Sequence, residues 1–545
     1  MDAARVRGAL LDFGRPYIYL LGSGDLVAAD GDITLGRLTN SPGIYVPALR
    51  PEQLGDRSFL ADHGVAYPYV TGAMANGIAS EALVEAVSAH GMLGFFGAAG
   101  LDVARVERAI DTLAASQLAR VYGFNLIHSP ADPRLESQIV DLYLRRGIQL
   151  IEASAFLGLT LPLVRYRVTG IHRNAAGAIV TPNRVIAKAS RTEVAAKFFA
   201  PPPEAMLNEL VRTGAISAQQ AQWARQIPVA QDVSAEADSG GHTDNRPALT
   251  LVPTLIALRD AMQHQHGYDV PLRVGAAGGI ATPEAVAAAF AMGAAYVMTG
   301  SINQSAIESG SSNIVRRMLA EASETDVAMA PAADMFEMGV KVQVLKRGTM
   351  FPMRATKLYE LYRAHASLEA LPAADRDILE KQYFRKSLAA AWQDTCAFFL
   401  ERDPEQIARG ERDPRHKMAL VFRAYLGQSS KWANSGIQDR KMDFQVWCGP
   451  AMGAFNHWVK GSHLESPDQR TVAGIAMNLL YGACLLMRSS HLRHAGVAVD
   501  AAVAKWQPLP LSSLQTLVGR EPPRNSLATA LIPHHVSPSV GAEFV

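Results

Sequence analysis

Two short segments of small residues have the composition of a phosphate-binding site. Ala277-Gly278-Gly279 closes one apolar run, and Thr282-Pro283 follows it with residues that begin a helix. Thr299-Gly300-Ser301 closes the next apolar run. Glycines let backbone N–H groups approach a phosphate closely, and a helix N-terminus adds positive partial charge. Two such corners favour phosphate binding over glycines that serve only tight packing.

A histidine among glycines and carboxylates is the best candidate for proton transfer. Residues 236–244 read EADSGGHTD, so that Gly241 directly precedes His242. Glycines let a loop pass close to a bound ring, and histidine exchanges protons near neutral pH. A lone histidine is more often structural, but this setting favours an active-site role. The sequence has no HExxH motif and no cluster of histidines and cysteines, so no metal site is predicted.

Three further segments place candidate binding residues at the ends of apolar runs. Gly72-Ala73-Met74 combines small residues with a flexible thioether, which suits a planar ring lying on backbone. Asn125 can hydrogen-bond the edge of a pyrimidine, or it can cap the loop that follows. Lys188 stands at a buried strand end and needs an acceptor, either a cofactor, a substrate or a structural carboxylate.

Eight apolar runs could carry these residues on one surface. They are Tyr67–Thr71, Leu93–Gly97, Val121–Leu126, Gln149–Ser154, Val185–Ala189, Pro228–Ala235, Leu272–Ala276 and Ala295–Thr299. Most are separated by amphipathic stretches, which predicts parallel βα units. Eight units in about 250 residues indicate an α/β protein with a (βα)8 TIM barrel. An open doubly wound sheet is the alternative.

The rest of the chain divides around this barrel. We expect a β-rich N-terminal cap over residues 1–60 and the barrel over 61–302, with a hairpin inserted at 166–183 and turning at 174–177. Residues 303–500 are expected to form a helical lid, substrate domain or partner domain, and 501–545 a proline-rich tail that is loosely attached or disordered. Gly22-Ser23-Gly24 lacks the third glycine of a dinucleotide fingerprint, so we predict a simple turn there.

Composition argues against several classes of protein. A net charge of +1 over 545 residues provides no basic field for nucleic acid. The three cysteines are far apart and form no CxxC pair, which argues against disulfides or zinc and fits a cytoplasmic protein. The N-terminus lacks the apolar core of a secretion signal. The apolar run at 472–487 is shorter than the ~20 residues of a membrane span, so we predict a buried helix.

The chain resembles the PfaD-type, trans-acting enoyl reductases of polyketide and polyunsaturated fatty acid synthases, which are relatives of nitronate monooxygenase. The resemblance rests on YPYVTGAMANGIAS from Tyr67, YGFNLIHSP from Tyr122, EADSGGHTDNRP from Glu236, VGAAGGIATPEA from Val274, TGSINQ from Thr299 and CGPAMGAFNHWVKG from Cys448. It implies an FMN cofactor, NADPH as the donor, and an enoyl thioester carried by an acyl carrier protein. It also implies that His242 is the catalytic residue, and that Gly278, Gly279, Gly300 and Ser301 hold the FMN phosphate.

Other interpretations remain open at this stage. A nitronate monooxygenase would share barrel and flavin but pass electrons to oxygen, and a non-catalytic subunit would only scaffold a synthase. An IMP dehydrogenase-like barrel needs a cysteine after the sixth strand, whereas all three cysteines lie beyond residue 390. Six basic residues and one acid between 341 and 363 are either a docking face for an acidic carrier protein or an ordinary solvated face. A homodimer through the C-terminal region is a further expectation.

Overall fold

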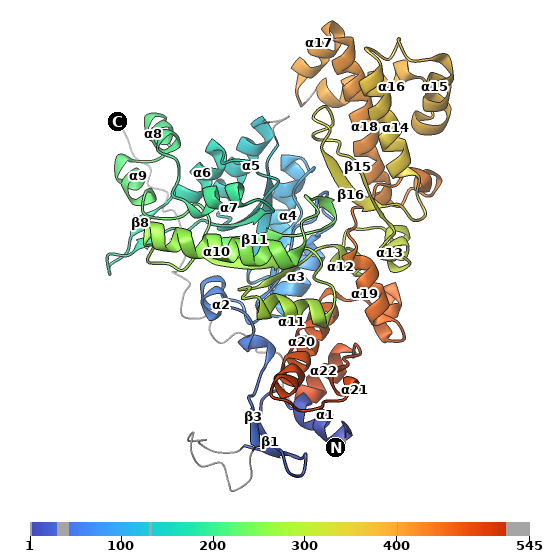
Figure 1. Ribbon diagram of the computed structural model, residues 1–545. Helices are drawn as coiled ribbons and strands as arrows, with labels where there is room; N and C mark the ends of the chain where they lie inside the picture. The colour runs from blue at the N-terminus through green and yellow to red at the C-terminus, as the bar shows by residue number, and fades with distance from the viewer. Residues whose placement is uncertain (1–2, 30–42, 130–132, 401, 519–545) are drawn as a thin grey trace.

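A computed structural model describes residues 3–29, 43–129, 133–400 and 402–518 of the chain. A βα barrel lies at its centre, a segment of helices stands at one side, and both termini of the described chain lie together at the other end (Figure 1). The N-terminal cap and the last helices come from opposite ends of the sequence, but their buried residues belong to one hydrophobic core.

Eight parallel strands close the barrel in the order β10-β11-β13-β14-β4-β5-β6-β7. Their bounds are β4 Tyr69–Thr71, β5 Leu93–Phe96, β6 Tyr122–Ile127, β7 Leu150–Ser154, β10 Arg184–Ala189, β11 Asp232–Glu236, β13 Arg273–Ala277 and β14 Val297–Thr299. Every predicted run overlaps one barrel strand, so the predicted TIM barrel is confirmed. The sixth predicted run begins earlier than β11. The N–H groups of Val229 and Ala230 donate to the carbonyls of Ala200 and Phe198 and not to a neighbouring strand.

Helices surround the strands and begin where the sequence offers caps. The principal barrel helices are α3 Glu81–Ala89, α4 Val103–Ala115, α5 Pro133–Arg145, α6 Leu161–Val168, α7 Thr192–Phe199, α10 Ala248–His266 and α11 Pro283–Ala291, with α8 Glu204–Arg212 and α9 Ala218–Ala224 added after α7. Ser80 accepts the Leu83 N–H at the start of α3. Thr282 accepts the Ala285 N–H at the start of α11, which carries Pro283 in its first turn.

The inserted hairpin is shorter than the sequence suggested. Residues 166–168 belong to α6, where Tyr166 is buried in the barrel core and Val168 is buried against residues of α8 and α9. The hairpin itself consists of β8 His172–Arg173 and β9 Ile179–Val180. Its turn lies at 174–177, as predicted, with Gly177 at φ +81°. The turn signals alone therefore placed the start of the insertion too early, because the apolar residues at 166–168 continue the helix.

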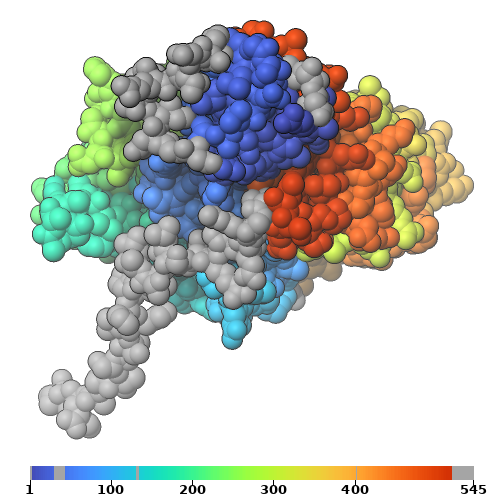
Figure 2. All heavy atoms as spheres, turned by 90° about the horizontal axis from the view of Figure 1, so that it is seen from below, coloured from blue at the N-terminus to red at the C-terminus, as the bar shows by residue number. Residues whose placement is uncertain are grey.

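The N-terminal cap is held by the last helices of the described chain. It contains α1 Ala3–Leu11 and a three-stranded antiparallel sheet of β1 Tyr17–Leu20, β2 Leu26–Ala28 and β3 Gly43–Val46. The predicted turn at Gly22-Ser23-Gly24 joins β1 to β2, with the Gly24 N–H donated to Leu20. Arg488 of α20 Val472–His494 donates to the carbonyls of Leu10 and Asp12. Seen from below, the two ends of the described chain lie side by side (Figure 2).

Helix α20 is long and apolar enough to cross a membrane, but 89% of its apolar window is buried inside the protein. It packs on α11, the cap and the residues that follow it, as a buried core helix was predicted to do. The expectation of a loose tail from residue 501 is wrong for 501–518. Trp506 is buried and its indole donates to Asn478, whose amide also exchanges hydrogen bonds with Leu509. Residues 519–545 lie outside the described chain.

The region after the barrel is not purely helical. Strands β15 Val327–Pro331 and β16 Lys341–Leu345 form a hairpin that pairs with the short β12 Gly241–His242. The other elements include α12 Ser301–Gln304, α13 Asn313–Ala320, α14 Phe351–Ala364, α15 Ala373–Ile378, α16 Leu388–Leu400, α17 Pro404–Arg412, α18 Pro414–Ser435, α19 Ala451–Val459, α21 Ala501–Ala504 and α22 Leu511–Val518. A π-helical turn, Leu379–Phe384, lies between α15 and α16, and a 3-10 turn, Gln438–Asp443, follows α18.

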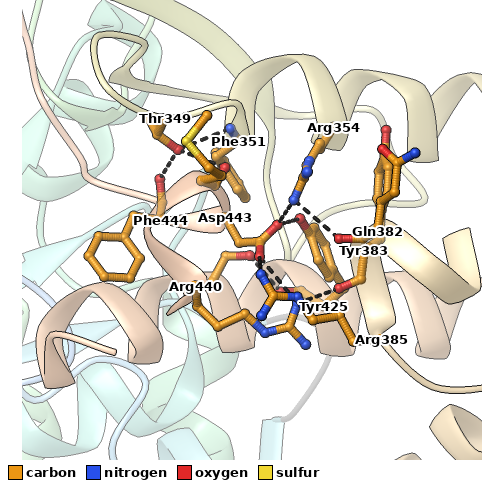
Figure 3. Close-up of polar contacts among 12 residues, drawn as sticks. Thr349, Phe351, Arg354, Gln382, Tyr383, Arg385, Tyr425, Arg440, Asp443 and Phe444 are labelled. Carbon is orange, nitrogen blue, oxygen red and sulfur yellow. Dashed lines mark hydrogen bonds and ion pairs between the residues drawn. The ribbon is translucent and has the colours of Figure 1, made fainter. Parts of the chain in front are cut away.

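Residues 351–443, from the start of α14 to the end of the 3-10 turn Gln438–Asp443, form what we call the helical segment. Its buried residues, together with those of β15 and β16, make a hydrophobic core separate from that of the barrel. Asp443 is fully buried at the base of the segment (Figure 3). Its carboxylate accepts the Tyr425 hydroxyl at 2.6 Å and pairs with Arg440 at 3.2 Å and with Arg354.

The two chain crossings into the helical segment are tied to each other beside Asp443. Thr349 donates its hydroxyl to the carbonyl of Phe444 at 2.9 Å and lies 3.2 Å from that of Met442 (Figure 3). The Met350 N–H also donates to Met442. These bonds fix the base of the helical segment, and hence its orientation over the barrel mouth.

Candidate functional site

A cavity of about 1070 Å³ opens at the carboxyl ends of the barrel strands. The structure brings all the predicted site residues together on its wall: Gly72, Ala73, Met74, Asn125, Lys188, Gly241, His242, Ala277, Gly278, Gly279, Thr299, Gly300 and Ser301. Parallel strands deliver their ends to one rim, so residues more than two hundred positions apart meet there. The far wall is made by the helical segment, which belongs to the region 303–500 for which a lid was one of the alternatives left open by the sequence.

The glycine corner after β13 has the backbone shape that an anion site requires. Gly278 has φ +79°, and a Cβ there would come within 2.6 Å of the Ala237 carbonyl carbon. Gly279 has φ +74° and faces open space. Within the described residues, the N–H groups of Gly278 and Gly279 donate no hydrogen bond. The adjoining α11 directs its N-terminus to this corner of the chain.

The corner after β14 is partly used by the protein itself. The Thr299 hydroxyl is buried between Tyr69 and Asn303, at 2.8 Å from each side chain. Ser301 accepts the Gly449 N–H at 3.1 Å. Gly300 faces open space. Of this predicted trio, Gly300 therefore offers the most accessible backbone, whereas the two hydroxyls also hold neighbouring segments in place.

The floor of the cavity is set by the end of β4. The Gly72 N–H donates to the Thr299 carbonyl at 3.0 Å, and the Ala73 N–H donates to Glu152 Oε2 at 2.7 Å. Met74 follows on the cavity wall. Two backbone donors are thus satisfied within the protein, and the surface they leave is small and apolar. A flat ring could lie against it without stranding a polar group.

Lys188 lies between two carboxylates. Its Nζ is 3.2 Å from Glu152 Oε1 and 3.2 Å from Glu236 Oε1. Burial raises the pKa of Glu152, against the opposing effect of Lys188. Burial also works against the charge on Lys188, but Glu236 and Glu152 outweigh it and raise the lysine pKa. A structural ion pair, one of the interpretations open from the sequence, is therefore present, and the ammonium also reaches the cavity wall.

Asn125 is oriented by the neighbouring strand. Its amide nitrogen donates to the Glu152 carbonyl at 3.1 Å and to the Ser154 hydroxyl at 2.9 Å. The side chain is buried yet still lines the cavity. Because both amide hydrogens point to β7, the group that Asn125 can present to a ligand is its carbonyl oxygen, an acceptor.

His242 faces the cavity beside an acid that the sequence did not reveal. Its Nε2 lies 3.2 Å from Asp334 Oδ2, which belongs to the loop between β15 and β16. Burial disfavours the imidazolium, but Asp334 and then Glu236 outweigh it, so the pKa of His242 is raised. The pKa of Asp334 is lowered, because His242 overcomes the cost of burial. The pair therefore holds the proton on His242 to higher pH than on an isolated imidazole.

The loop that carries His242 is fixed from both sides. Gly240 lies so close to the backbone of Cys448 that a Cβ would come within 2.9 Å of its nitrogen. His242 pairs with Val342 in the β12–β16 ladder, and Gln343 donates to Asp238 and to the Ser239 carbonyl at 2.8 Å. The CGPAMG motif from residue 448 thus serves to clamp the histidine loop. Its closeness to that loop could not be read from spacing.

These residues fit a flavin mononucleotide. Two buried polar atoms of the cavity wall, Ser239 Oγ and His242 Nε2, have no hydrogen-bond partner of good geometry among the described residues. Gly279 and Gly300 leave open space at the anion corner. A bound phosphate and ring would supply partners for the free N–H groups and for these two atoms. The chain thus offers an anion corner, a flat floor and polar groups at the mouth.

The helical segment closes the other side of the cavity. Helices α16 and α18 pack side by side, and both contribute cavity residues. The cavity face of α18 extends from Leu420 to Trp432, a length of roughly 18 Å at the usual helical rise. Arg423 of this helix donates to Ala333, beside the His242 partner, and Ser430 accepts from Asn76 at the end of β4. Helix α18 thus contacts two separate places on the barrel mouth.

The fold and the cavity define a class of protein: a closed βα barrel whose strand ends carry an anion corner and a proton-bearing imidazole. A family model described as "Nitronate monooxygenase" matches residues 57–361. The chain belongs to that family of oxidoreductases. A second model, "[Acyl-carrier-protein] S-malonyltransferase, inserted helical domain", matches residues 365–444, which is most of the helical segment.

Two curated relatives show how far the similarity extends. A polyunsaturated fatty acid synthase component of Thraustochytrium sp. is 50% identical over 448 residues, covering 81% of this chain and 30% of that protein. The polyketide biosynthesis protein PksE of Bacillus subtilis is 42% identical over 496 residues, 86% of this chain and 64% of that protein. The chain spans less than two thirds of the length of these curated relatives.

A solved structure agrees with them. The enoyl reductase domain of MlnA, from the macrolactin biosynthesis cluster of Bacillus amyloliquefaciens, has a TM-score of 0.76 and 39% identity, over 81% of this chain and 99% of that chain. The resemblance to PfaD-type enoyl reductases is thereby confirmed.

Proposed function

We propose that the chain is an FMN-dependent enoyl reductase that uses NADPH to reduce the α,β double bond of a thioester carried by an acyl carrier protein. One observation carries the proposal: a single cavity of about 1070 Å³ joins a glycine corner to an imidazole that is paired with a carboxylate. Ordinary ligand pockets occupy about 300–1,000 Å³. There is thus space for a cofactor and for part of a substrate beside it. The synthase relatives support the carrier-bound substrate.

Each group of residues has a role in this proposal. When bound, FMN supplies the hydride chemistry between a nicotinamide donor and a conjugated double bond. Gly278, Gly279 and Gly300 bind its phosphate through backbone N–H groups. Asn125 and Lys188 present an acceptor and a positive charge at the mouth. The helical segment covers the mouth and limits the access of water.

His242 holds the proton that the reduced thioester needs at Cα. Asp334 and then Glu236 raise the pKa of His242, so the imidazole keeps its proton to higher pH, and the side chain lies on the cavity wall. A protonated imidazole can also donate a hydrogen bond to the thioester carbonyl and stabilise developing negative charge there. Both roles need the same N–H group directed into the cavity.

The test compares His242→Gln with wild type after both are loaded with FMN. We expect turnover of NADPH with a short enoyl thioester to fall by about 100-fold or more, with flavin content unchanged. His172→Gln is the matched control, because His172 is exposed in the inserted hairpin. Unchanged turnover in His242→Gln would remove the histidine from the reaction. A wild-type protein that cannot be loaded with flavin would favour a non-catalytic subunit.

A nitronate monooxygenase activity is the second candidate, because the family model itself carries that description. It needs the same barrel and cofactor but an oxidant in place of the enoyl thioester. Oxygen consumption with a nitroalkane, in the absence of NADPH, would support it. NADPH oxidation that depends on an enoyl thioester, with no nitroalkane reaction, would support the reductase.

A further inference from the structure

The cations of the cavity wall are not all neutralised. The basic side chains that line it are Lys188, Arg191, Lys341, Lys386, Arg402, Arg423, Lys431 and Arg440. Five of them pair with carboxylates: Lys188 with Glu152 and Glu236, Arg191 with Asp244, Lys386 with Asp394, Arg423 with Glu337, and Arg440 with Asp443. Within the described part of the chain, Lys341, Arg402 and Lys431 form no such pair. Lys341 is the first residue of β16, whereas Arg402 and Lys431 both lie beside Phe398.

Arg402 and Lys431 both lie close to one aromatic ring. The Arg402 guanidinium carbon lies 4.4 Å from the centre of the Phe398 ring, and the Lys431 ammonium lies 5.7 Å from it. Phe398 is on α16, Arg402 closely follows that helix, and Lys431 is on α18. Phe398 is 43% exposed at the rim of the cavity. The packing of two helices thus brings two cations to one exposed ring.

This arrangement favours an anionic ligand. Two cations beside one ring, neither paired with a carboxylate among the described residues, leave positive charge that a bound anion would offset. The neighbouring Asp403 lines the same cavity but accepts a hydrogen bond from Gln406. Arginine and lysine together supply both a fork of donors and a point charge, the combination that proteins use for phosphate groups. An exposed ring beside them can pack against the organic part of such a ligand.

We propose that Arg402 and Lys431, both beside Phe398, form a second phosphate-binding site of the cavity, separate from the glycine corner. Its ligand is the phosphate ester of a substrate that enters the cavity from its rim. The proposal rests on the proposed function, because two substrates of that reaction carry such a group. One is a thioester on a 4′-phosphopantetheine arm, and the other is the 2′-phosphate of NADPH.

The helical segment explains why the site stands at the rim. Its α18 face extends along the cavity from the region of His242 to Lys431. A long substrate whose reactive end lies near His242 would pass along this face, and its phosphate would be bound where it leaves the protein. A site of this kind holds the arm of a substrate without contacting its reacting atoms, so it acts on binding and not on the chemical step.

The experiment uses FMN-loaded full chain and two pairs of ligands that differ by one phosphate. The first pair is crotonyl-4′-phosphopantetheine and crotonyl-pantetheine, and the second is NADPH and NADH. In wild type, we expect the phosphate to lower KM for one of the pairs by about tenfold. In the double variant Arg402→Gln/Lys431→Gln that advantage should disappear, with kcat and flavin content unchanged. The control Lys381→Gln/Arg409→Gln removes two exposed charges of the same segment that do not line the cavity.

The outcomes separate the sources of the phosphate. Loss of discrimination in the crotonyl pair assigns the site to the pantetheine arm, and loss in the nicotinamide pair assigns it to the dinucleotide. If the double variant discriminates both pairs as wild type does, the site is not a phosphate site. Calorimetric titration of 4′-phosphopantetheine and pantetheine, without turnover, keeps the two proposals distinguishable. Phosphate-dependent binding that the double variant loses would uphold the site even in a protein that reduces no enoyl thioester.

Discussion

The barrel and the helical segment form two walls of one cavity, but they are held by different means. On the barrel side, glycines, strand ends and backbone hydrogen bonds set the shape, and Gly278 has no room for a side chain. On the helical side, the helices have a hydrophobic core of their own. Side chains at the base of the segment orient them, where Asp443 contacts Arg354, Arg440 and Tyr425. Backbone geometry thus builds the barrel wall, and ionic side-chain contacts place the helical wall.

The difference has a consequence for what each wall tolerates. A glycine corner loses its backbone conformation when a Cβ or a strained φ is introduced, even if the charge is unchanged. A buried ionic centre fails when one partner is removed, because the remaining charges are left without compensation. Substitutions of these two kinds should therefore separate the two walls experimentally.

Replacement of Gly278 by alanine should have the largest effect. Its φ of +79° disfavours any side chain, and the new Cβ would lie 2.6 Å from the Ala237 carbonyl carbon. We expect bound flavin to fall to below about a tenth of the wild-type content, as measured by the visible spectrum of purified protein. Gly177→Ala is the control, because Gly177 has φ +81° but open space around it in the hairpin. A Gly278→Ala protein with full flavin would contradict the assignment of the corner.

Asp443→Asn should loosen the helical segment and leave the barrel intact. Three side chains lose the charge that they contact, and breaking a buried ion pair costs about 3–5 kcal/mol. Hydrogen–deuterium exchange should show faster exchange in α14 and α18, with barrel strands and flavin content unchanged. Asp439→Asn serves as the control, because Asp439 is 72% exposed and pairs only with the exposed Arg385. Equal loosening of barrel and segment would show that the two walls unfold together.

Asp334→Asn should move the pH dependence of turnover. Asp334 raises the pKa of His242, so a proton stays on the imidazole to higher pH. Without it the pKa falls, and the high-pH limb of the kcat profile should move to lower pH. Asp394→Asn is the control, because Asp394 lines the same cavity but pairs with Lys386. A limb that stays in place would mean that another group supplies the proton.

The smallest effect is expected from charge reversal at Lys346 and Arg347. Half of the six basic residues at 341–363 pair with carboxylates in the fold: Arg347 lies 3.7 Å from Asp326, Lys357 pairs with Asp375 at 2.8 Å, and Arg354 pairs with Asp443. Exposed pairs contribute little, so KM for a carrier-bound enoyl substrate should change by less than about twofold in Lys346→Glu/Arg347→Glu. A rise in KM of about tenfold would instead support a docking role for this basic face.

The barrel wall could be predicted from the sequence because its signals are local. Apolar runs at regular spacing, capping residues such as Ser80 and Thr282, and glycines at strand ends each restrict the nearby backbone. The rule that parallel strands share one rim then brings the candidates together. The same signals misplaced the edges of the inserted hairpin and the residues at 501–518, where burial by distant partners prevailed.

Local chemistry therefore sufficed to predict the barrel, the glycine corners and the histidine at the mouth. Only the folded chain decided that Asp334 stands beside His242, that Glu152 contacts both Ala73 and Lys188, and that Arg402 and Lys431 both lie beside Phe398. The physical reason is that backbone conformation depends on neighbours in sequence, whereas a charge finds its partner through space. Each of those contacts joins elements whose distance is set by packing alone.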